Sequence, residues 1–159
     1  MKVLFVCTGN ICRSPMAEAI ARHLLGQRAV QGVEVASAGT AAWDGSPASE
    51  GAYLVTLEHG LDVSAHRARQ LTADMVAGAD LVLGMSAHHL ERAEALGGTG
   101  KSHLLGEYAG VPAATAEVED PFGGDLDEYR RTFAQLETLL TAAVERLANP
   151  QTDANPGDD

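Results

Sequence analysis

Two residues near the N-terminus, Cys7 and Arg13, have the side chains needed to attack and hold a phosphoryl group. A cysteine thiolate is a nucleophile that can form a covalent intermediate, and a guanidinium can donate two parallel hydrogen bonds to one phosphoryl group. If the chain between them closes around a tetrahedral anion, the sulfur lies beneath the phosphorus and the guanidinium beside two oxygens. The pattern therefore predicts phosphoryl chemistry through a cysteine.

The same residue types have plainer interpretations. A free cysteine that ends a buried strand is often an inert core residue, and Arg13 could be a surface charge. Cys7 and Cys12 are the only cysteines, too few for a disulfide framework, and no Cys or His stands beside them at zinc-ligand spacing. We therefore expect no metal and no other cofactor, and the surrounding sequence has to decide between the interpretations.

The flanking segments favour chemistry. Residues 3–6 form a continuous apolar run, typical of a parallel strand buried on both faces, and Ser14-Pro15 is typical of a helix start with Ser14 as N-cap. A loop between a strand and a helix directs backbone N–H groups and the positive end of the helix dipole at one point. This field would stabilise the thiolate of Cys7, to which the Ser14 hydroxyl could also donate. The predicted phosphate-binding loop contains Thr8, Gly9, Asn10, Ile11, Cys12 and Ser14.

Two residues of this loop suit an unusual backbone. Gly9 permits a positive φ or a close approach to an anion, and Asn10 tolerates a left-handed φ while bonding to nearby backbone. The loop contains neither G-x-x-x-x-G-K-[ST] nor G-x-G-x-x-G. It therefore predicts an anion site that differs from the known nucleotide loops.

Strand and helix patterns alternate along the rest of the chain. Further strands are predicted at 33–36, 81–85 and 103–105, helices at 14–26, 49–59, 71–75, 86–96 and 126–147, and a small-residue turn at 37–40. This alternation predicts an α/β fold of three layers, a four-stranded parallel sheet with helices on both faces and ligands at the carboxyl ends of the strands. We expect one domain over 1–148 and a disordered acidic tail over 149–159.

The composition disfavours several classes of partner. The 159 residues carry 11 Lys and Arg against 22 Asp and Glu, and the resulting charge of −11 repels nucleic acid and anionic membranes. No apolar run reaches the roughly 18 to 20 residues of a membrane span, and the N-terminus lacks a signal-peptide pattern. We expect a cytoplasmic protein, a monomer or weak dimer, that captures an anionic substrate by local structure.

Five motifs together give the sequence a family resemblance. They are residues 6–18 around the loop, Ser37-Ala38-Gly39, His66-Arg67-Ala68-Arg69-Gln70, Ala79-Asp80-Leu81-Val82-Leu83 and Asp120-Pro121-Phe122-Gly123-Gly124. In combination they resemble the low-molecular-weight protein-tyrosine-phosphatase family, with features of its bacterial protein-arginine phosphatase branch. The resemblance implies a flavodoxin-like fold and an enzyme that removes a phosphoryl group from a protein side chain and releases inorganic phosphate.

The resemblance also implies catalytic roles. Cys7 forms a thiophosphate intermediate, Arg13 binds the phosphoryl group, and Asp120 is the general acid for the leaving group and then the base for water. From the residues alone, Asp120 could equally belong to an Asx turn or to the entry of the last helix.

Supporting roles follow from the same resemblance. Asn10, Ser37 and His66 hold the loop through hydrogen bonds, and Cys12 can pair with the nucleophile on oxidation. Without the resemblance, His66 would be an ordinary exposed or core histidine and Cys12 a small filler. The remaining histidines, including the pair at 88–89, are expected to have no role in the site.

The identity of the phosphorylated side chain depends on the pocket walls. In the resembled family, Thr at the position of Ile11 accompanies phosphoarginine and Ile accompanies phosphotyrosine. Ile11, Trp43 and Phe122 would provide apolar and aromatic walls for a phenyl phosphate, although Trp43 could instead serve ordinary packing. Against this, residues 120–124 and 104–108 resemble the arginine-phosphatase branch. We expect phosphotyrosine, with phosphoarginine as the alternative.

Two other classes are less favoured. An arsenate reductase generally needs further cysteines to relay oxidation, and only Cys12 is available. A non-catalytic phosphate-binding module would not require Cys7, Arg13 and Asp120 together.

Overall fold

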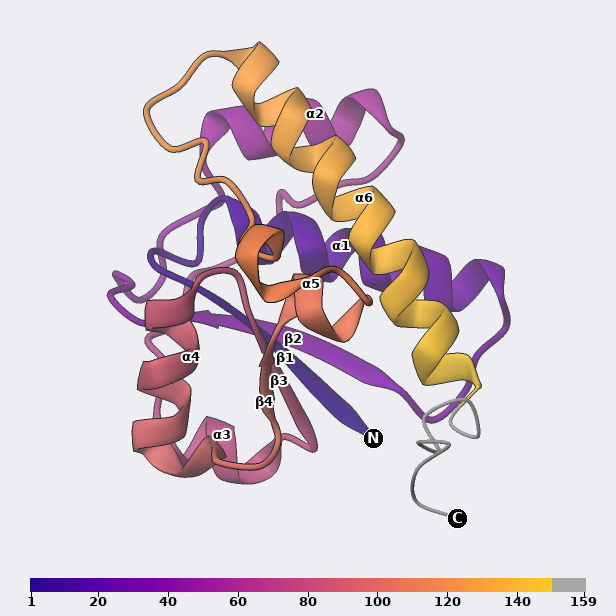
Figure 1. Cartoon of the computed structure of the whole chain (residues 1–159). Helices are drawn as coiled ribbons and strands as arrows, with labels where there is room; N and C mark the ends of the chain where they lie inside the picture. The colour runs from indigo at the N-terminus through magenta and orange to yellow at the C-terminus, as the bar shows by residue number, and fades with distance from the viewer. Residues whose placement is uncertain (150–159) are drawn as a thin grey trace.

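The buried run at the N-terminus forms one of the two inner strands of a parallel sheet (Figure 1). The structure, a computed structural model, describes residues 1–149, so the predicted tail beyond Asn149 lies outside the described residues. The strands are β1 (Lys2–Cys7), β2 (Glu34–Gly39), β3 (Leu81–Gly84) and β4 (Ser102–Leu104), and they pair in the order β2-β1-β3-β4, always parallel. The predicted fold class is confirmed.

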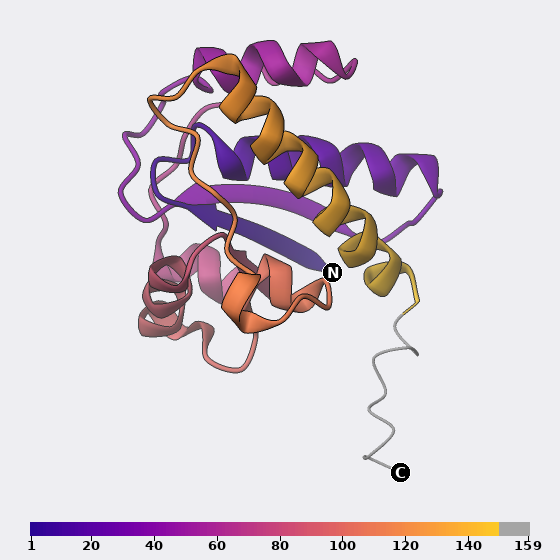
Figure 2. The same cartoon turned by 45° about the horizontal axis from the view of Figure 1, so that its top comes forward.

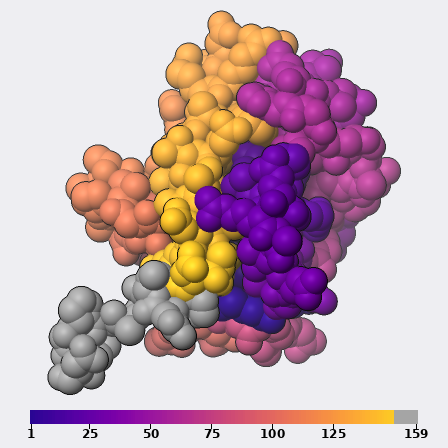
Figure 3. Space-filling model, turned by 90° about the vertical axis from the view of Figure 1, so that its right-hand side faces the viewer, coloured from indigo at the N-terminus to yellow at the C-terminus, as the bar shows by residue number. Residues whose placement is uncertain are grey.

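Helices cover both faces of the sheet (Figure 2). They are α1 (Arg13–Gln27), α2 (Glu50–Glu58), α3 (Ala73–Gly78), α4 (Ala87–Ala93), α5 (Leu105–Tyr108) and α6 (Leu126–Ala148), with a π-helical turn η1 (Glu94–Gly98) and a 3₁₀ turn η2 (Ala113–Thr115). The core clusters place α1 and α6 on one face and α3 and α4 on the other. On the outer surface, α6 runs alongside α1 (Figure 3).

Alternation along β1 explains both layers of the core. Val3 and Phe5 pack in the cluster that contains α1 and α6, whereas Leu4 and Val6 pack in the cluster that contains α3 and α4. The long helix α6 buries one stripe at helical spacing, which includes the predicted Tyr129, Phe133, Leu136, Leu140 and Val144. The predicted last helix is therefore confirmed, with its apolar stripe in the core.

Two local predictions were wrong, and one short helix was missed. Residues 37–39 do not form a turn but end β2, because they pair in register with residues 5–7 of β1. The first helix begins at Arg13 with Cys12 as N-cap, because the Ser14 hydroxyl is used by other residues of the loop. The short helix α5 was not predicted, since a segment of four residues is too short to show a helical period.

The order of the strands fixes where a ligand can bind. β1 lies between β2 and β3, and an open α/β sheet binds ligands at the carboxyl ends of the strands where the order reverses. Cys7 ends β1 and therefore lies at this position. No helix within residues 1–149 is long and apolar enough to cross a membrane; the cytoplasmic location and the oligomeric state stay predictions.

Candidate active site

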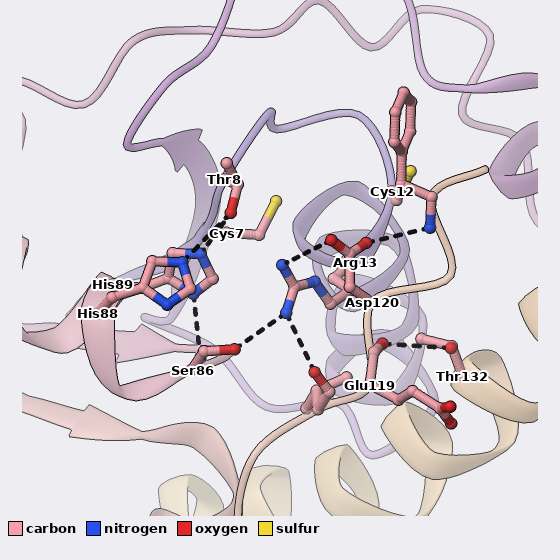
Figure 4. A network of polar contacts seen from close by, with 12 residues as sticks. Cys7, Thr8, Cys12, Arg13, Ser86, His88, His89, Glu119, Asp120 and Thr132 are labelled. Atoms are coloured by element: carbon pink, nitrogen blue, oxygen red, sulfur yellow. Dashed lines mark hydrogen bonds and ion pairs between the residues drawn. The ribbon is translucent and has the colours of Figure 1, made fainter. Parts of the chain in front are cut away.

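A pocket of about 290 Å³ opens at the carboxyl end of β1. Its walls include Cys7, Arg13 and Asp120, the loop residues Thr8, Gly9, Ile11 and Cys12, and the aromatic residues Trp43 and Phe122. Residues from the beginning, the middle and the end of the chain thus meet around one space. Figure 4 shows Cys7, Arg13 and Asp120 from close by.

The loop that lines the pocket has unused hydrogen-bond donors. Within the part of the chain that the structure describes, the backbone N–H groups of residues 8–12 donate no hydrogen bond to the protein. These groups lie just before α1, where the helix dipole is positive. Unpaired N–H groups at a helix start are the usual means by which a protein binds a phosphate-like anion.

The thiol of Cys7 is held by a directed chain of hydrogen bonds. The Asn10 amide donates to the Ser14 hydroxyl oxygen at 2.8 Å, and that oxygen lies 2.9 Å from the Cys7 sulfur. Because the Ser14 oxygen already accepts a bond from Asn10, its own proton is free to point at the sulfur. This geometry stabilises a thiolate, the form of cysteine that attacks phosphorus.

Asn10 is the buried centre of the loop. It has φ of 55°, the left-handed conformation expected of it, and is 0% exposed. Its amide nitrogen also donates to Ser37 Oγ at 2.9 Å, and its side-chain oxygen accepts from the Arg69 backbone N–H at 2.9 Å. His66 Nε2 lies 2.6 Å from its carbonyl oxygen. The structure thus brings the predicted supporting residues Ser37 and His66 to Asn10 rather than to the pocket.

Two glycines lie in or against the loop. Gly9 does not use the positive φ that its type permits, and the left-handed residue of the loop is its neighbour Asn10. Gly39, at the end of β2, leaves no room for a side chain: a Cβ there would collide with the carbonyl oxygen of Thr8 and the backbone nitrogen of Asn10. The loop therefore rests directly on the backbone of β2.

The guanidinium of Arg13 is buried and oriented by fixed partners. Its Nη1 donates to Ser86 Oγ at 3.1 Å and to the Val118 carbonyl oxygen at 3.1 Å, and its Nη2 lies 3.5 Å from Asp120 Oδ2 (Figure 4). These partners follow β3 and precede α6. A guanidinium held in this way presents a fixed edge to an anion in the pocket.

Asp120 forms the Asx turn that the sequence allowed and also faces Arg13. Its Oδ1 accepts from the Phe122 backbone N–H at 3.1 Å, which is an Asx turn, while its other oxygen faces Arg13. It does not begin α6, whose N-cap is Asp125. The Asx turn keeps the half-exposed carboxylate over the pocket, the position that a proton donor for a leaving group requires.

The pocket entrance is apolar and open. Trp43 and Phe122 line it although they are 83% and 68% exposed, and Ile11 is partly buried beside them. The Ile11 carbonyl accepts from the Ser49 backbone N–H at 2.8 Å, which ties the loop to the start of α2. The three predicted pocket residues therefore surround one opening.

Cys12 lies on the α6 side of the loop. Its sulfur contacts Ser49 Oγ at 3.2 Å and Tyr129 Oη at 3.3 Å. Burial raises the pKa of the Cys12 thiol. Burial and the hydrogen bond with Cys12 also raise the pKa of Tyr129 to about 12, so both groups are protonated at neutral pH.

His89 was expected to have no role, yet it contacts the loop. The ring is 0% exposed, its Nδ1 accepts from the Ser86 backbone N–H at 3.0 Å, and its Nε2 lies 2.8 Å from Thr8 Oγ1. The only sequence signal was the position of His89, three residues after a helix N-cap, where a side chain can reach back to the N-cap N–H.

Ser49, Ser86, Arg69 and Tyr129 also touch the loop and were not predicted as site residues. Within residues 1–149, no group of three or more His, Cys, Asp or Glu side chains is arranged to hold a metal ion.

Known proteins share this sequence pattern. The family model described as low molecular weight phosphotyrosine protein phosphatase matches residues 2–152. A protein-arginine-phosphatase of Geobacillus stearothermophilus is 39% identical over 150 residues, covering 94% of this chain and 98% of the relative. EpsP of Ralstonia solanacearum, a probable low molecular weight protein-tyrosine-phosphatase, is 37% identical over 147 residues, covering 91% and 94%.

A solved structure shares this fold. It is a cysteine-to-serine mutant of the YwlE arginine phosphatase with its active-site serine phosphorylated. It superposes with a TM-score of 0.85 at 33% identity, and 100% of both chains is covered.

Proposed function

Because this chain belongs to the low molecular weight phosphotyrosine protein phosphatase family and is thus a hydrolase, we propose that it hydrolyses protein phosphotyrosine through a covalent intermediate on Cys7. One observation carries the proposal. The Cys7 thiol, the Arg13 guanidinium and four loop residues with unpaired N–H groups line a single pocket; the four are Thr8, Gly9, Ile11 and Cys12. A thiol beneath an anion site is the arrangement that nucleophilic attack on phosphorus needs.

In the first step, the Cys7 sulfur attacks the phosphorus and the bond to the tyrosyl oxygen breaks. Protonated Asp120 gives its proton to this oxygen, so a neutral phenol leaves. Arg13 and the loop N–H groups stabilise the negative charge on the three remaining phosphoryl oxygens in the transition state. Such electrostatic stabilisation is usually the largest single contribution to the rate. The product of this step is a thiophosphate on Cys7.

In the second step, water attacks the same phosphorus from the side that the phenol has left. Asp120, now a carboxylate, accepts a proton from the water, and the bond between sulfur and phosphorus breaks. Inorganic phosphate leaves, and Cys7 returns as a thiolate held by the Ser14 hydroxyl at 2.9 Å. In the phosphorylated YwlE mutant a serine carries the phosphoryl group, which supports a covalent step in this family.

The entrance of the pocket supports an aromatic substrate. Ile11, Trp43 and Phe122 offer apolar and aromatic surface around the opening, and a phenyl ring gains from such contacts. Phosphoarginine is the second candidate, because the Geobacillus relative at 39% identity is a protein-arginine-phosphatase. The half-exposed Asp120 carboxylate would also suit a substrate that carries a guanidinium.

Turnover of para-nitrophenyl phosphate and of a phosphotyrosine peptide tests the covalent mechanism. Cys7→Ser should abolish measurable turnover, and mass spectrometry of wild-type enzyme quenched during turnover should locate a phosphoryl group on Cys7. Full activity in Cys7→Ser would refute the mechanism.

A selectivity assay tests the role of Ile11. Replacing Ile11 by Thr adds a hydroxyl and removes apolar surface at the pocket wall, so the ratio of kcat/KM for phosphoarginine peptide to that for phosphotyrosine peptide should rise by roughly tenfold or more. Ile11→Val removes one methylene without adding a hydroxyl and is the matched control. An unchanged ratio in Ile11→Thr would mean that another residue selects the substrate.

A further inference from the structure

The hydroxyl of Thr8, the residue directly after Cys7, has its hydrogen-bond partner on another element of the fold. The residue lines the pocket above Cys7, and its oxygen lies 2.8 Å from Nε2 of the buried His89 (Figure 4). The two residues are 81 positions apart in sequence. The direction of the hydrogen bond between them decides what Thr8 can do.

The other nitrogen of the imidazole fixes that direction. His89 Nδ1 lies 3.0 Å from the Ser86 backbone N–H, a group that can only donate. Nδ1 is therefore the acceptor, and in the neutral ring the proton is on Nε2. Burial lowers the pKa of His89 to about 3, and the neighbouring His88 and Arg13 act in the same sense. The ring is thus neutral throughout the physiological range, and Nε2–H donates to Thr8.

A hydroxyl oxygen that accepts in this way directs its own proton elsewhere. Within residues 1–149, the only other partner of Thr8 Oγ1 is His88 Nε2, at 3.5 Å. A contact of this length is at most a weak hydrogen bond. The Thr8 hydroxyl proton is therefore available at the wall of the pocket, beside the unpaired N–H groups of residues 8–12.

We propose that Thr8 donates this proton to the phosphoryl group bound above Cys7, and that His89 is the positioning residue that commits the Thr8 hydroxyl to this role. The inference rests on the proposed phosphatase function, since it needs an anion in this pocket. It repeats the arrangement beneath the sulfur, where Asn10 donates to Ser14 and frees the Ser14 proton for Cys7. Each hydroxyl is turned towards the reaction centre by a buried donor behind it.

Four variants of the full chain separate the two residues, with binding of inorganic phosphate measured by calorimetry at pH 7. Thr8→Val keeps the shape but removes the donor and should weaken binding roughly tenfold, as expected for one hydrogen bond to a charged group. Thr8→Ser should recover most of the affinity.

His89→Asn keeps an acceptor near the Ser86 N–H but loses the donor to Thr8, so it should match the loss of phosphate affinity in Thr8→Val. His89→Gln places an amide N–H near the position of Nε2 and should restore binding.

The double variant Thr8→Val/His89→Asn tests whether His89 acts through Thr8. Its loss should be no greater than that of Thr8→Val alone, because the two changes remove one interaction. If His89 had a purely structural role, the double variant would lose the phosphate affinity lost in His89→Asn in addition to that lost in Thr8→Val. This result would overturn the proposal.

Two further results would also overturn it: unchanged phosphate affinity in Thr8→Val, or a loss in His88→Asn equal to that in His89→Asn, which would show that the effect does not depend on the hydrogen bond from His89 to Thr8. Thermal melting shows which variants are folded, and Thr8→Val, at a partly exposed position, decides the question even if the His89 variants unfold. The binding assay does not require turnover. A failure of the Thr8 proposal can therefore be distinguished from a failure of the proposed phosphatase function, which the Cys7→Ser turnover assay tests.

Discussion

Asp120 and Arg13 neutralise each other in the free enzyme, where Arg13 Nη2 lies 3.5 Å from Asp120 Oδ2. A phosphoryl group that binds Arg13 has to compete with this carboxylate, while the proposed mechanism uses the same carboxyl as a proton donor. Asp120 should therefore oppose phosphate binding and promote turnover, and substitution should separate the two effects.

Asp120→Asn should lower kcat by about 10²- to 10⁴-fold, the usual contribution of a general acid. Binding of inorganic phosphate should stay equal or become tighter, because the competing charge is gone. Steady-state kinetics on a phosphotyrosine peptide and calorimetry with phosphate measure the two quantities.

The control for Asp120→Asn is Asp127→Asn, which removes an exposed carboxylate paired with Arg130 outside the pocket. A parallel fall of kcat and phosphate affinity in Asp120→Asn would indicate damage to the site rather than loss of an acid.

At the scale of residues, the sequence predicted what lies close along the chain. The thiol, the guanidinium and the left-handed Asn10 share one loop, so their types and spacing carry the information. Contacts between distant segments could not be predicted in this way: His89 reaches Thr8 over 81 positions and Tyr129 reaches Cys12 over 117. Such pairs depend on the packing of whole elements, which a short motif does not describe.

At the scale of elements, the end of β2 supports the phosphate-binding loop. Gly39 lies in register with Cys7, and the Thr40 and Ala41 N–H groups donate at 2.9 Å to the carbonyl oxygens of Cys7 and Thr8. The small residues at this position were predicted to form a turn. Small residues suit a turn, but they suit equally well a strand that packs closely against another backbone. That other backbone, the loop after β1, lies in a distant part of the sequence, so the residue types alone could not distinguish the two structures.

Gly39→Ala should therefore damage the loop as well as the fold. The added Cβ meets backbone atoms of Thr8 and Asn10, which cannot rotate away, so we expect a loss of about 1–3 kcal/mol in the free energy of unfolding and a loss of phosphate binding. Denaturant unfolding and calorimetry measure these.

Gly26→Ala is the matched control, since nothing lies within 4 Å of its Cβ position in α1. It should be neutral or more stable by up to about 1 kcal/mol. Equal stability of Gly39→Ala and wild type would show that the loop can move away from β2.

At the scale of the whole molecule, an acidic protein binds an anionic substrate. The formal charge of −11 repels a phosphate monoester at long range, whereas the loop N–H groups and Arg13 attract it at contact. Salt screens the long-range part first, because exposed charges interact across the solvent while the buried guanidinium does not.

Raising the ionic strength from about 10 mM to about 150 mM should therefore tighten the binding of inorganic phosphate, by roughly twofold or more. Calorimetry in potassium chloride, with sucrose as an uncharged control, measures the effect. Weaker binding in salt would show that the positive charge of the pocket dominates even at long range.

The partners of Arg13 have a consequence for how the protein is made. This residue of the N-terminal loop is oriented by Ser86, Val118 and Asp120, and α1 packs against α6 near the end of the described chain. A nascent chain on the ribosome that has exposed only the first half of its sequence already contains the nucleophile but lacks every group that orients the guanidinium. Phosphatase activity should consequently appear only once the last third of the polypeptide has emerged and docked.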